Sequence, residues 1–185
     1  TEKIKGPDIF AHLVWMLPKK TSSKAFIIGP SVPLENGTTS KDTLNTITKN
    51  RNLDIEIRDS VSQETMRDFF AQSYLTVLPS RYDTLNLVAL ESLFAGCPVV
   101  LGKNTGVVGF IKKEFPTMPI HVLPTDDLST SIDVLQHAIE NYHEDRKAIA
   151  KILESFNTST FSSKSLLDIY EQPSKRIRKT DFLFD

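Results

Sequence analysis

The chain has 185 residues, 39% of them hydrophobic, which suits one globular domain with a substantial core. Its 22 Lys and Arg residues against 23 Asp and Glu give a net charge of −1, so no basic field indicates binding to nucleic acid or an anionic membrane. Cys97 stands alone, which excludes an intrachain disulfide, and the four histidines lack metal-ligand spacing. No apolar run reaches the roughly 20 residues of a membrane helix, and no signal peptide is visible. We therefore expect a cytoplasmic protein.

Strands and helices are predicted to alternate over the first two thirds of the chain. A helix starts at Pro7, since proline suits the first helical position and Asp8 suits the positive end of the helix dipole. Ser40 and Ser62 are the expected caps of two later helices. Predicted helices cover 7–17, 40–50, a segment after residue 62, 85–95 and 107–111, and predicted strands cover 24–29, 53–57, 74–78, 98–101 and 120–123. The run 24–29 has the continuous apolar character of a strand buried on both faces.

The character of the sequence changes after Pro124. Three helices are predicted there, over 127–142, 144–156 and 162–170, before a polar and basic tail at 173–185. We expect one domain over residues 1–172, an α/β fold with a parallel sheet covered by helices on both faces and a helical carboxyl-terminal end. The chain begins at Thr1 and enters an organised segment almost at once, so we expect it to be a piece of a longer protein.

One loop is the expected ligand site of this sheet. Ligands of parallel α/β sheets bind at the carboxyl ends of the strands, and the loop that follows the strand 74–78 lies at such an end. The helix 85–95 starts in this loop, and its free N–H groups favour an anion such as a phosphate. The residues at its start have mostly short or apolar side chains, which suits binding through the main chain: Thr84, Leu85, Asn86, Leu87 and Val88.

Two carboxylates bracket the start of that helix, with seven residues between them. Glu91 could accept two hydrogen bonds from a ribose diol, as acidic residues do in dinucleotide-binding folds. Asp83 could accept hydrogen bonds from a second polyol such as a hexose. The simpler alternatives are a solvated glutamate and an aspartate that only stabilises a turn.

The run PSRYDTLNLVALESLFAGCPVV over residues 79–100 resembles the donor-site signature of retaining GT-B glycosyltransferases, the group 1 family with the E-x7-E motif. The similarity extends outward at consistent spacing over about residues 3–111. Lys5 and Gly6 resemble the family's "KG", residues 26–29 its "VIVG" strand, residues 57–61 its "F-x-G-x-V" segment, and Gly106 its "GG-x-x-E-I" loop. This resemblance implies a Rossmann-like fold, one half of a GT-B enzyme.

The resemblance also implies roles for individual residues. Glu91 would bind the ribose hydroxyls, Asp83 would face the donor sugar, and Lys5 would neutralise the departing diphosphate. The amides of 86–88 would contact the diphosphate, and Arg58 would lie near the base. Electrostatic stabilisation of this kind needs no essential divalent metal, and no cofactor is expected beyond a UDP-sugar or GDP-sugar substrate.

The sequence departs from the family pattern at four positions. Asp83 replaces a glutamate, Asn86 and Asp59 replace glycines, and Val107 replaces the second glycine of the loop near Gly106. The departures at Asp83 and Asn86 keep a second reading open, in which the domain binds a nucleotide sugar or acts as a scaffold without catalysis. A third reading is another GT-B-like enzyme such as a UDP-sugar epimerase.

The function expected from the resemblance is that of a donor-substrate domain. The parent enzyme would transfer a sugar from a nucleotide diphosphate sugar to an acceptor with retention of configuration. The acceptor site would lie in an amino-terminal domain outside this chain, so the fragment alone would be inactive. Expected partners are the nucleotide sugar and that domain, without nucleic acid, and with membrane association only through the parent protein.

Overall fold

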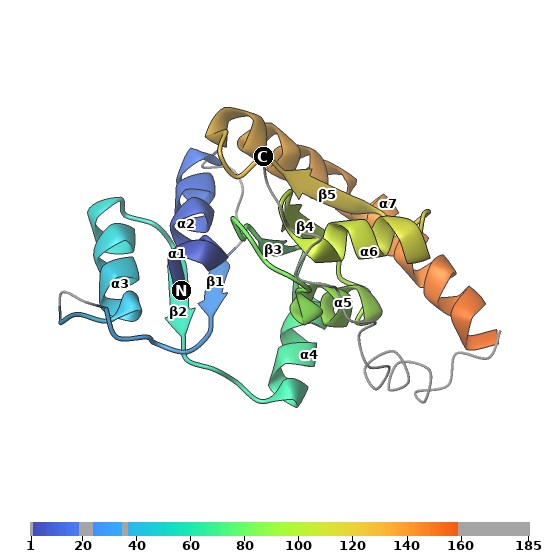
Figure 1. The fold of residues 1–185 in the computed structure, drawn as a ribbon, viewed down its shortest axis with the longest axis horizontal. Helices are drawn as coiled ribbons and strands as arrows, with labels where there is room; N and C mark the ends of the chain where they lie inside the picture. Colours follow the sequence, from blue (N-terminus) through green and yellow to red (C-terminus); the bar gives the residue numbers. More distant parts are fainter. Residues whose placement is uncertain (1, 19–23, 35–36, 159–185) are drawn as a thin grey trace, which may run out of the picture.

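The computed structural model describes residues 2–18, 24–34 and 37–158, which alternate between strands and helices (Figure 1). The strands are β1 (Ala25–Ile28), β2 (Ile55–Arg58), β3 (Thr76–Leu78), β4 (Val99–Gly102) and β5 (Ile120–Leu123). The helices are α1 (Glu2–Lys5), α2 (Pro7–Met16), α3 (Ser40–Asn50), α4 (Gln63–Gln72), α5 (Leu87–Phe94), α6 (Gly106–Glu114) and α7 (Leu128–Thr158). All five strands predicted from the sequence are present, each within about two residues of the expected position.

Every strand pairing is parallel, which confirms the predicted α/β class. The hydrogen bonds divide the strands into two groups, β1 with β2 and the series β3-β4-β5. β4 is central in its group and entirely buried, whereas every residue of β1 and of β3 is only partly buried. The expectation that the apolar run 24–29 would be buried on both faces is therefore not met in this structure.

Helices cover both faces of the three-stranded sheet. The strict alternation of side chains along a strand sends Val99 and Leu101 of β4 to one face and Val100 to the other. The first face packs against α5, α6 and Ile149 of α7, and the second against α2 and the amino-terminal half of α7. Burying a side chain of this size contributes about 1.5–3 kcal/mol, so the two clusters anchor β4, on which the neighbouring loops depend.

Side-chain caps define where two helices begin. Ser62 accepts a hydrogen bond from the N–H of Thr65 at 3.1 Å, as predicted for the cap of α4. The cap of α3 is Thr39 rather than Ser40, because Thr39 and Asp42 form a reciprocal capping box.

The carboxyl-terminal part is one long helix instead of the predicted pair. α7 passes without a break through the expected boundary at residue 143, since no glycine or proline lies between residues 128 and 158. The helix predicted at 162–170 and the basic tail at 173–185 fall outside the described residues. Within those residues, no helix has the length and apolar character needed to span a membrane.

Candidate functional site

The loop after β3 is held in place by backbone contacts with its neighbours. Asp83 forms an isolated parallel bridge with Thr105, and its carbonyl accepts a hydrogen bond from the N–H of Gly106 at 2.9 Å. A Cβ atom at Gly106 would lie 1.9 Å from the carbonyl oxygen of Thr84, far inside contact distance. Glycine is therefore required here because the start of α6 touches the loop directly. This contact explains why α6 begins with a glycine.

The turn between α1 and α2 approaches the other end of the same loop. Gly6 has φ of +72°, and a Cβ atom there would lie 2.1 Å from the carbonyl oxygen of Pro79. The N–H of Arg81 donates to the carbonyl of Ile4 at 2.7 Å. The segment that contains the predicted site residue Lys5 is thus fixed against the loop after β3.

Arg81 strengthens this attachment through its side chain. Its guanidinium donates two hydrogen bonds to the carboxylate of Asp8, at 2.9 and 2.7 Å, and a third to the carbonyl of Lys3. The hydrogen bonds from Arg81 lower the pKa of Asp8, and those to Asp8 raise the pKa of Arg81. A bidentate pair of this kind fixes geometry as well as charge. It holds the start of α2 beside the loop.

The two residues predicted to be catalytic lie in contact. Lys5 Nζ is 2.6 Å from Asp83 Oδ2, although 78 positions separate the two residues. The Lys5 side chain is 61% exposed and that of Asp83 only 12%, so the ammonium faces solvent while the carboxylate lies beneath it. A lysine ammonium has three N–H donors, which leaves two for an incoming anion after the bond to Asp83. The Lys5 ammonium can therefore donate two hydrogen bonds to a ligand.

The start of α5 offers unoccupied backbone donors. Asn86 is the N-cap residue and is 8% exposed, yet its side chain makes no capping hydrogen bond. Within the described part of the chain, no group accepts from the N–H of Leu87 or Val88. These free donors and the helix dipole make the position suitable for an anion. The prediction of a phosphate-facing helix start fits this geometry.

Glu91 lies one turn further along α5 and is exposed. Its carboxylate forms no ion pair with any residue of the described ranges. Two apolar side chains close to Glu91 in the sequence also reach solvent, Val88 with 37% exposure and Leu85 with 41%. Thr84 is exposed as well. The surface at the start of α5 therefore presents a free carboxylate, apolar side chains and free backbone donors.

Arg58 lies outside the cluster formed by Lys5, Asp83 and the start of α5. It ends β2 in the two-stranded sheet, and its Nε is 2.5 Å from Glu56 Oε1. Its guanidinium carbon lies 5.2 Å from the ring centre of Phe26 and 5.1 Å from that of Phe69. The side chain is therefore already engaged by one carboxylate and two aromatic rings. The structure does not bring it into the cluster around Lys5, and its predicted contact with a base stays a prediction.

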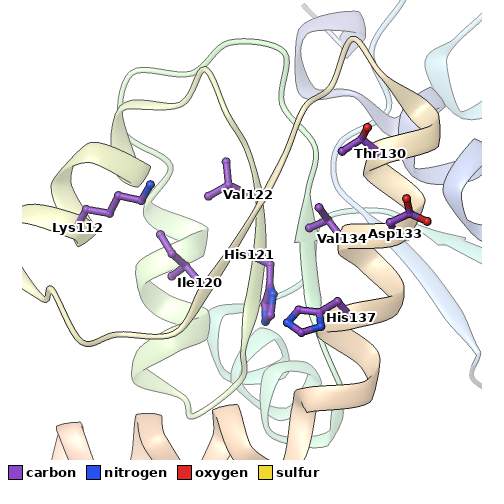
Figure 2. Close-up of a pocket in the computed structure, with 8 residues that line it drawn as sticks. All are labelled: Lys112, Ile120, His121, Val122, Thr130, Asp133, Val134 and His137. Carbon is purple, nitrogen blue, oxygen red and sulfur yellow. The ribbon is translucent and has the colours of Figure 1, made fainter.

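A separate groove of about 480 Å³ lies between β5, α6 and α7 (Figure 2). None of the predicted site residues lines it; its lining residues are Lys112, Ile120, His121, Val122, Thr130, Asp133, Val134 and His137. Among the residues that the structure describes, no cluster of three or more His, Cys, Asp or Glu side chains could hold a metal ion.

Sequence reasoning missed the contribution of Arg81 to the site. The only signals were its place inside the motif run and an acidic residue, Asp8, in the first turn of the first long helix. The two lie 73 positions apart, and no periodicity links them. Their pairing could be found only from the fold.

Comparisons with known proteins identify the family to which the chain is similar. A family model described as "Family 4 Glycosyltransferase in conflict systems" matches residues 1–160. The uncharacterized glycosyltransferase MJ1607 of Methanocaldococcus jannaschii is 29% identical over 73 residues, which are 40% of this chain and 19% of that protein.

Solved structures show the same fold at low sequence identity. WaaG, a glycosyltransferase involved in lipopolysaccharide biosynthesis, superposes with a TM-score of 0.68 at 16% identity over 92% of this chain and 44% of its own. Sucrose-phosphate synthase of Thermosynechococcus elongatus gives 0.67 at 16% identity, over 92% of this chain and 42% of its own. A variant of S. aureus TarM in complex with UDP gives 0.57 at 19% identity, over 90% of this chain and 32% of its own. The chain therefore has the fold of one Rossmann-like half of a GT-B protein, and spans less than half the length of these relatives.

Proposed function

Because the chain belongs to the family 4 glycosyltransferases found in conflict systems, we propose that it is the donor-binding half of an enzyme that transfers a sugar from a nucleotide diphosphate sugar. The observation on which the proposal rests is the unoccupied start of α5 beside the exposed ammonium of Lys5. An incoming diphosphate would accept hydrogen bonds from the N–H groups of Leu87 and Val88 and from Lys5. Together these groups supply the positive charge that a departing diphosphate needs.

Glu91 is the proposed ribose contact. It is exposed, free of ion pairs within the described ranges, and one turn beyond the proposed phosphate position. A carboxylate in that place can accept both hydroxyls of a ribose diol. The exposed side chains of Thr84, Leu85 and Val88 would border the nucleotide, and Gly106 would keep the loop close to α6.

Asp83 is the proposed contact on the sugar side. Its carboxylate is bound by Lys5, so a sugar hydroxyl would share an acceptor that already holds one strong hydrogen bond. We propose transfer with retention of configuration, in which Lys5 shifts from the carboxylate towards the diphosphate as negative charge develops there. The proposed donor carries a uracil or a guanine base. Arg58 is the side chain that we place near this base.

The remaining proposals concern the parent protein. The acceptor would bind to an amino-terminal domain, and the active site would form between that domain and the loop after β3. The proposal places the enzyme in the cytoplasm, with any membrane association made by the rest of the protein. Charge neutralisation by Lys5 and the amides of α5 would replace a divalent metal.

A titration of the chain by isothermal calorimetry tests the binding part of this proposal. UDP or GDP should bind, and the matching nucleoside without phosphates should bind at least about tenfold more weakly, because it lacks the charge-assisted hydrogen bonds. Glu91→Ala should lower the affinity for the diphosphate by about tenfold, the value of one such bond. Glu140→Ala, which removes an exposed carboxylate from α7, is the matched control. Failure of both diphosphates to bind, or equal affinity of the two variants, would contradict the proposal.

A domain that binds a nucleotide sugar without catalysis is the second candidate. It is favoured by the short contact that already neutralises Lys5 with Asp83. The parent protein separates the two candidates, because a catalytic domain requires Lys5 for transfer. If Lys5→Met leaves sugar transfer by the parent protein unchanged, the catalytic role proposed for Lys5 is wrong. If the intact parent protein binds UDP without transferring sugar, the second candidate is correct.

A further inference from the structure

Asn86, the residue at which α5 begins, carries a carboxamide without a hydrogen-bond partner. The residue is only 8% exposed. Within the described residues, neither the oxygen nor the nitrogen of its side chain forms a hydrogen bond. Polar groups buried in native proteins are nearly always paired, and an unpaired one destabilises the fold. The presence of asparagine at this position therefore needs a reason other than stability.

Capping of α5 is not that reason. Asparagine is a preferred N-cap residue, because its side-chain oxygen can accept from the N–H two or three residues further on. Thr39 and Ser62 cap α3 and α4 in this way. At α5 the N–H of Ala89 donates instead to the main-chain carbonyl of Asn86 at 3.1 Å, and the N–H of Val88 finds no acceptor in the described ranges. The side chain of Asn86 thus makes neither of the bonds that a cap would make.

The carboxamide nevertheless reaches solvent. Among the described residues that are not exposed, Arg51 Nη1 is the one side-chain nitrogen or oxygen that is both fully enclosed and unpaired. Both polar atoms of the unpaired Asn86 side chain therefore keep an opening to solvent. Because this side chain is short, the opening lies at the start of α5, where Leu85 and Val88 also reach solvent. A ligand bound there can supply the missing partner.

The chemistry of the carboxamide indicates which part of a nucleotide sugar it contacts. Its oxygen accepts hydrogen bonds, and its nitrogen donates two. A diphosphate ion only accepts hydrogen bonds, so it would pair the nitrogen and leave the oxygen unpaired. A sugar hydroxyl both donates and accepts, so it can pair either atom, and two neighbouring hydroxyls can pair both. The side chain therefore suits the sugar better than the diphosphate.

The neighbours of Asn86 support the same assignment. The N–H groups of Leu87 and Val88, which follow it, are the proposed contacts of the diphosphate. Asp83, which precedes it, is the proposed contact of the sugar, but its carboxylate already accepts from Lys5 at 2.6 Å. Asn86 lies between these two groups in the sequence and offers a second acceptor on the sugar side.

We propose that the side chain of Asn86 binds a hydroxyl group of the donor sugar and thereby helps to select that sugar. The inference rests on the proposed function, because it requires a diphosphate at the start of α5. The family pattern has a glycine here, which offers main-chain groups alone, so this contact would distinguish the chain from that pattern. A sugar that lacks the hydroxyl would leave the carboxamide unpaired, and a site of this kind discriminates against such a sugar.

Calorimetric titration of the 185-residue chain tests the proposal. The ligands are UDP, GDP, UDP-glucose, UDP-galactose, UDP-N-acetylglucosamine and GDP-mannose, and the quantity compared is the affinity for each nucleotide sugar divided by that for its own diphosphate. Asn86→Ala removes the carboxamide and keeps the main-chain N–H, so it should lower this ratio about tenfold for at least one sugar. Asn50→Ala, which removes an exposed carboxamide at the end of α3, is the matched control and should leave every ratio unchanged.

Monodeoxy analogues of the selected sugar identify the hydroxyl. One analogue should bind the unmodified chain about tenfold more weakly than the complete sugar does. This loss should disappear in Asn86→Ala, because the carboxamide and the hydroxyl no longer interact there. Urea unfolding without ligand gives an independent measurement. Because the side chain makes no capping bond, Asn86→Ala should not lower the unfolding midpoint.

Four results would overturn the proposal and leave the diphosphate site standing. The first is an unchanged ratio for all four sugars, and the second is an equal loss of affinity for a sugar and its diphosphate. The third is the lack of any deoxy analogue whose loss depends on Asn86. The fourth is a lowered unfolding midpoint of Asn86→Ala, which would show that the side chain is a cap in solution. If the unmodified chain binds neither UDP nor GDP, the proposed function itself is wrong, and this inference fails with it.

Discussion

Lys5 is the residue whose charge the proposed site depends on most. Lys5→Met keeps the length of the side chain and removes its ammonium. We expect the affinity for UDP or GDP to fall about tenfold or more, because one charge-assisted hydrogen bond of about 1.5–3 kcal/mol is lost. The affinity for the nucleoside alone should not change. Calorimetric titration measures both values.

The matched control for this variant is Lys151→Met, which removes an exposed ammonium from α7. Lys151→Met should change folding stability by no more than about 1 kcal/mol. Lys5→Met should cost about 1–3 kcal/mol, because it leaves the carboxylate of Asp83, whose side chain is only 12% exposed, without its partner. A parallel fall in nucleoside affinity would show that Lys5 shapes the whole pocket rather than contacting the diphosphate.

The pair of Asp8 and Arg81 predicts a pH dependence of stability. Hydrogen bonds from Arg81 lower the pKa of Asp8 below its ordinary value of 3.8. The folded state therefore gains stability above that value and loses it as pH falls through the lower pKa of the folded state. Asp8→Asn should be less stable than the unmodified chain at pH 6, and the difference should shrink below about pH 4. Urea unfolding at both values measures it, and a difference that is constant with pH would contradict the assignment.

At the scale of single residues, the sequence identified the candidate site residues but not the contacts between them. Lys5, Asp83 and Glu91 were found by their place in a motif. The contact between Lys5 and Asp83 spans 78 positions and depends on the turn at Gly6, which no local pattern describes. For Arg58 the resemblance predicts a position beside the base of the nucleotide. In the structure its side chain instead forms an ion pair with Glu56.

Two glycines on α6 give a matched test of how an element holds the site. Gly106→Ala places a methyl group 1.9 Å from the carbonyl oxygen of Thr84 and must displace the loop from α6. We expect a loss of about 1–3 kcal/mol in the free energy of unfolding, typical of overpacking, together with weaker nucleotide binding. Gly109→Ala lies on the same helix, with nothing within 4 Å of the new atom. It should be neutral or add up to about 1 kcal/mol of stability, since alanine is the better helix former.

Urea denaturation of both variants, with a diphosphate titration of each, checks this pair. Equal stability of the two variants would show that the loop yields without cost and that its contact with α6 does not position the site. Their comparison removes the general effect of replacing glycine in a helix, because the two positions differ mainly in what the added methyl group meets.

At the scale of elements, periodicity and capping chemistry predicted most of the fold. Most strands were found because their apolar runs are short and bounded by loop residues, and the strand predicted at 53–57 was found because apolar and acidic residues alternate in it. The cap of α3 was misplaced by one residue, since Thr39 and Ser40 are equally suitable by type and only the capping box with Asp42 distinguishes them. The division of the strands into two hydrogen-bonded groups could not be predicted, because the sequence of a strand does not show which other strands it pairs with.

The length of α7 follows from contacts across the whole molecule. Asp145 and Arg146 lie near the middle of the helix, where the sequence predicted a break. Asp145 Oδ2 is 2.7 Å from Nε2 of His121 on β5. Arg146 donates to the carbonyl of Ala71, at the end of α4, at 3.2 Å. Adjacent residues of one helix thus contact β5, at one edge of the three-stranded sheet, and α4, the helix that precedes β3 at the other edge, and a continuous helix keeps both contacts in register.

Removing the contact of Asp145 with His121 tests whether the polar contacts of α7 stabilise the sheet. Both side chains are mostly buried, with 14% and 12% exposure, so Asp145→Ala leaves an imidazole nitrogen without its partner in a poorly solvated place. We expect the free energy of unfolding to fall by about 1–3 kcal/mol. The adjacent variant Glu144→Ala breaks an ion pair with Lys147 in which both side chains are 73% exposed.

That control should cost no more than about 0.5 kcal/mol, because an exposed pair contributes little. Urea unfolding ranks the two variants, and hydrogen exchange locates the effect. With Asp145→Ala, amides of β5 should exchange faster while those of β2, in the other sheet, keep their rates. If Asp145→Ala costs no more than Glu144→Ala, then α7 is held by its apolar face alone, through residues such as Ile149 and Leu135, and the polar contact does not brace the sheet.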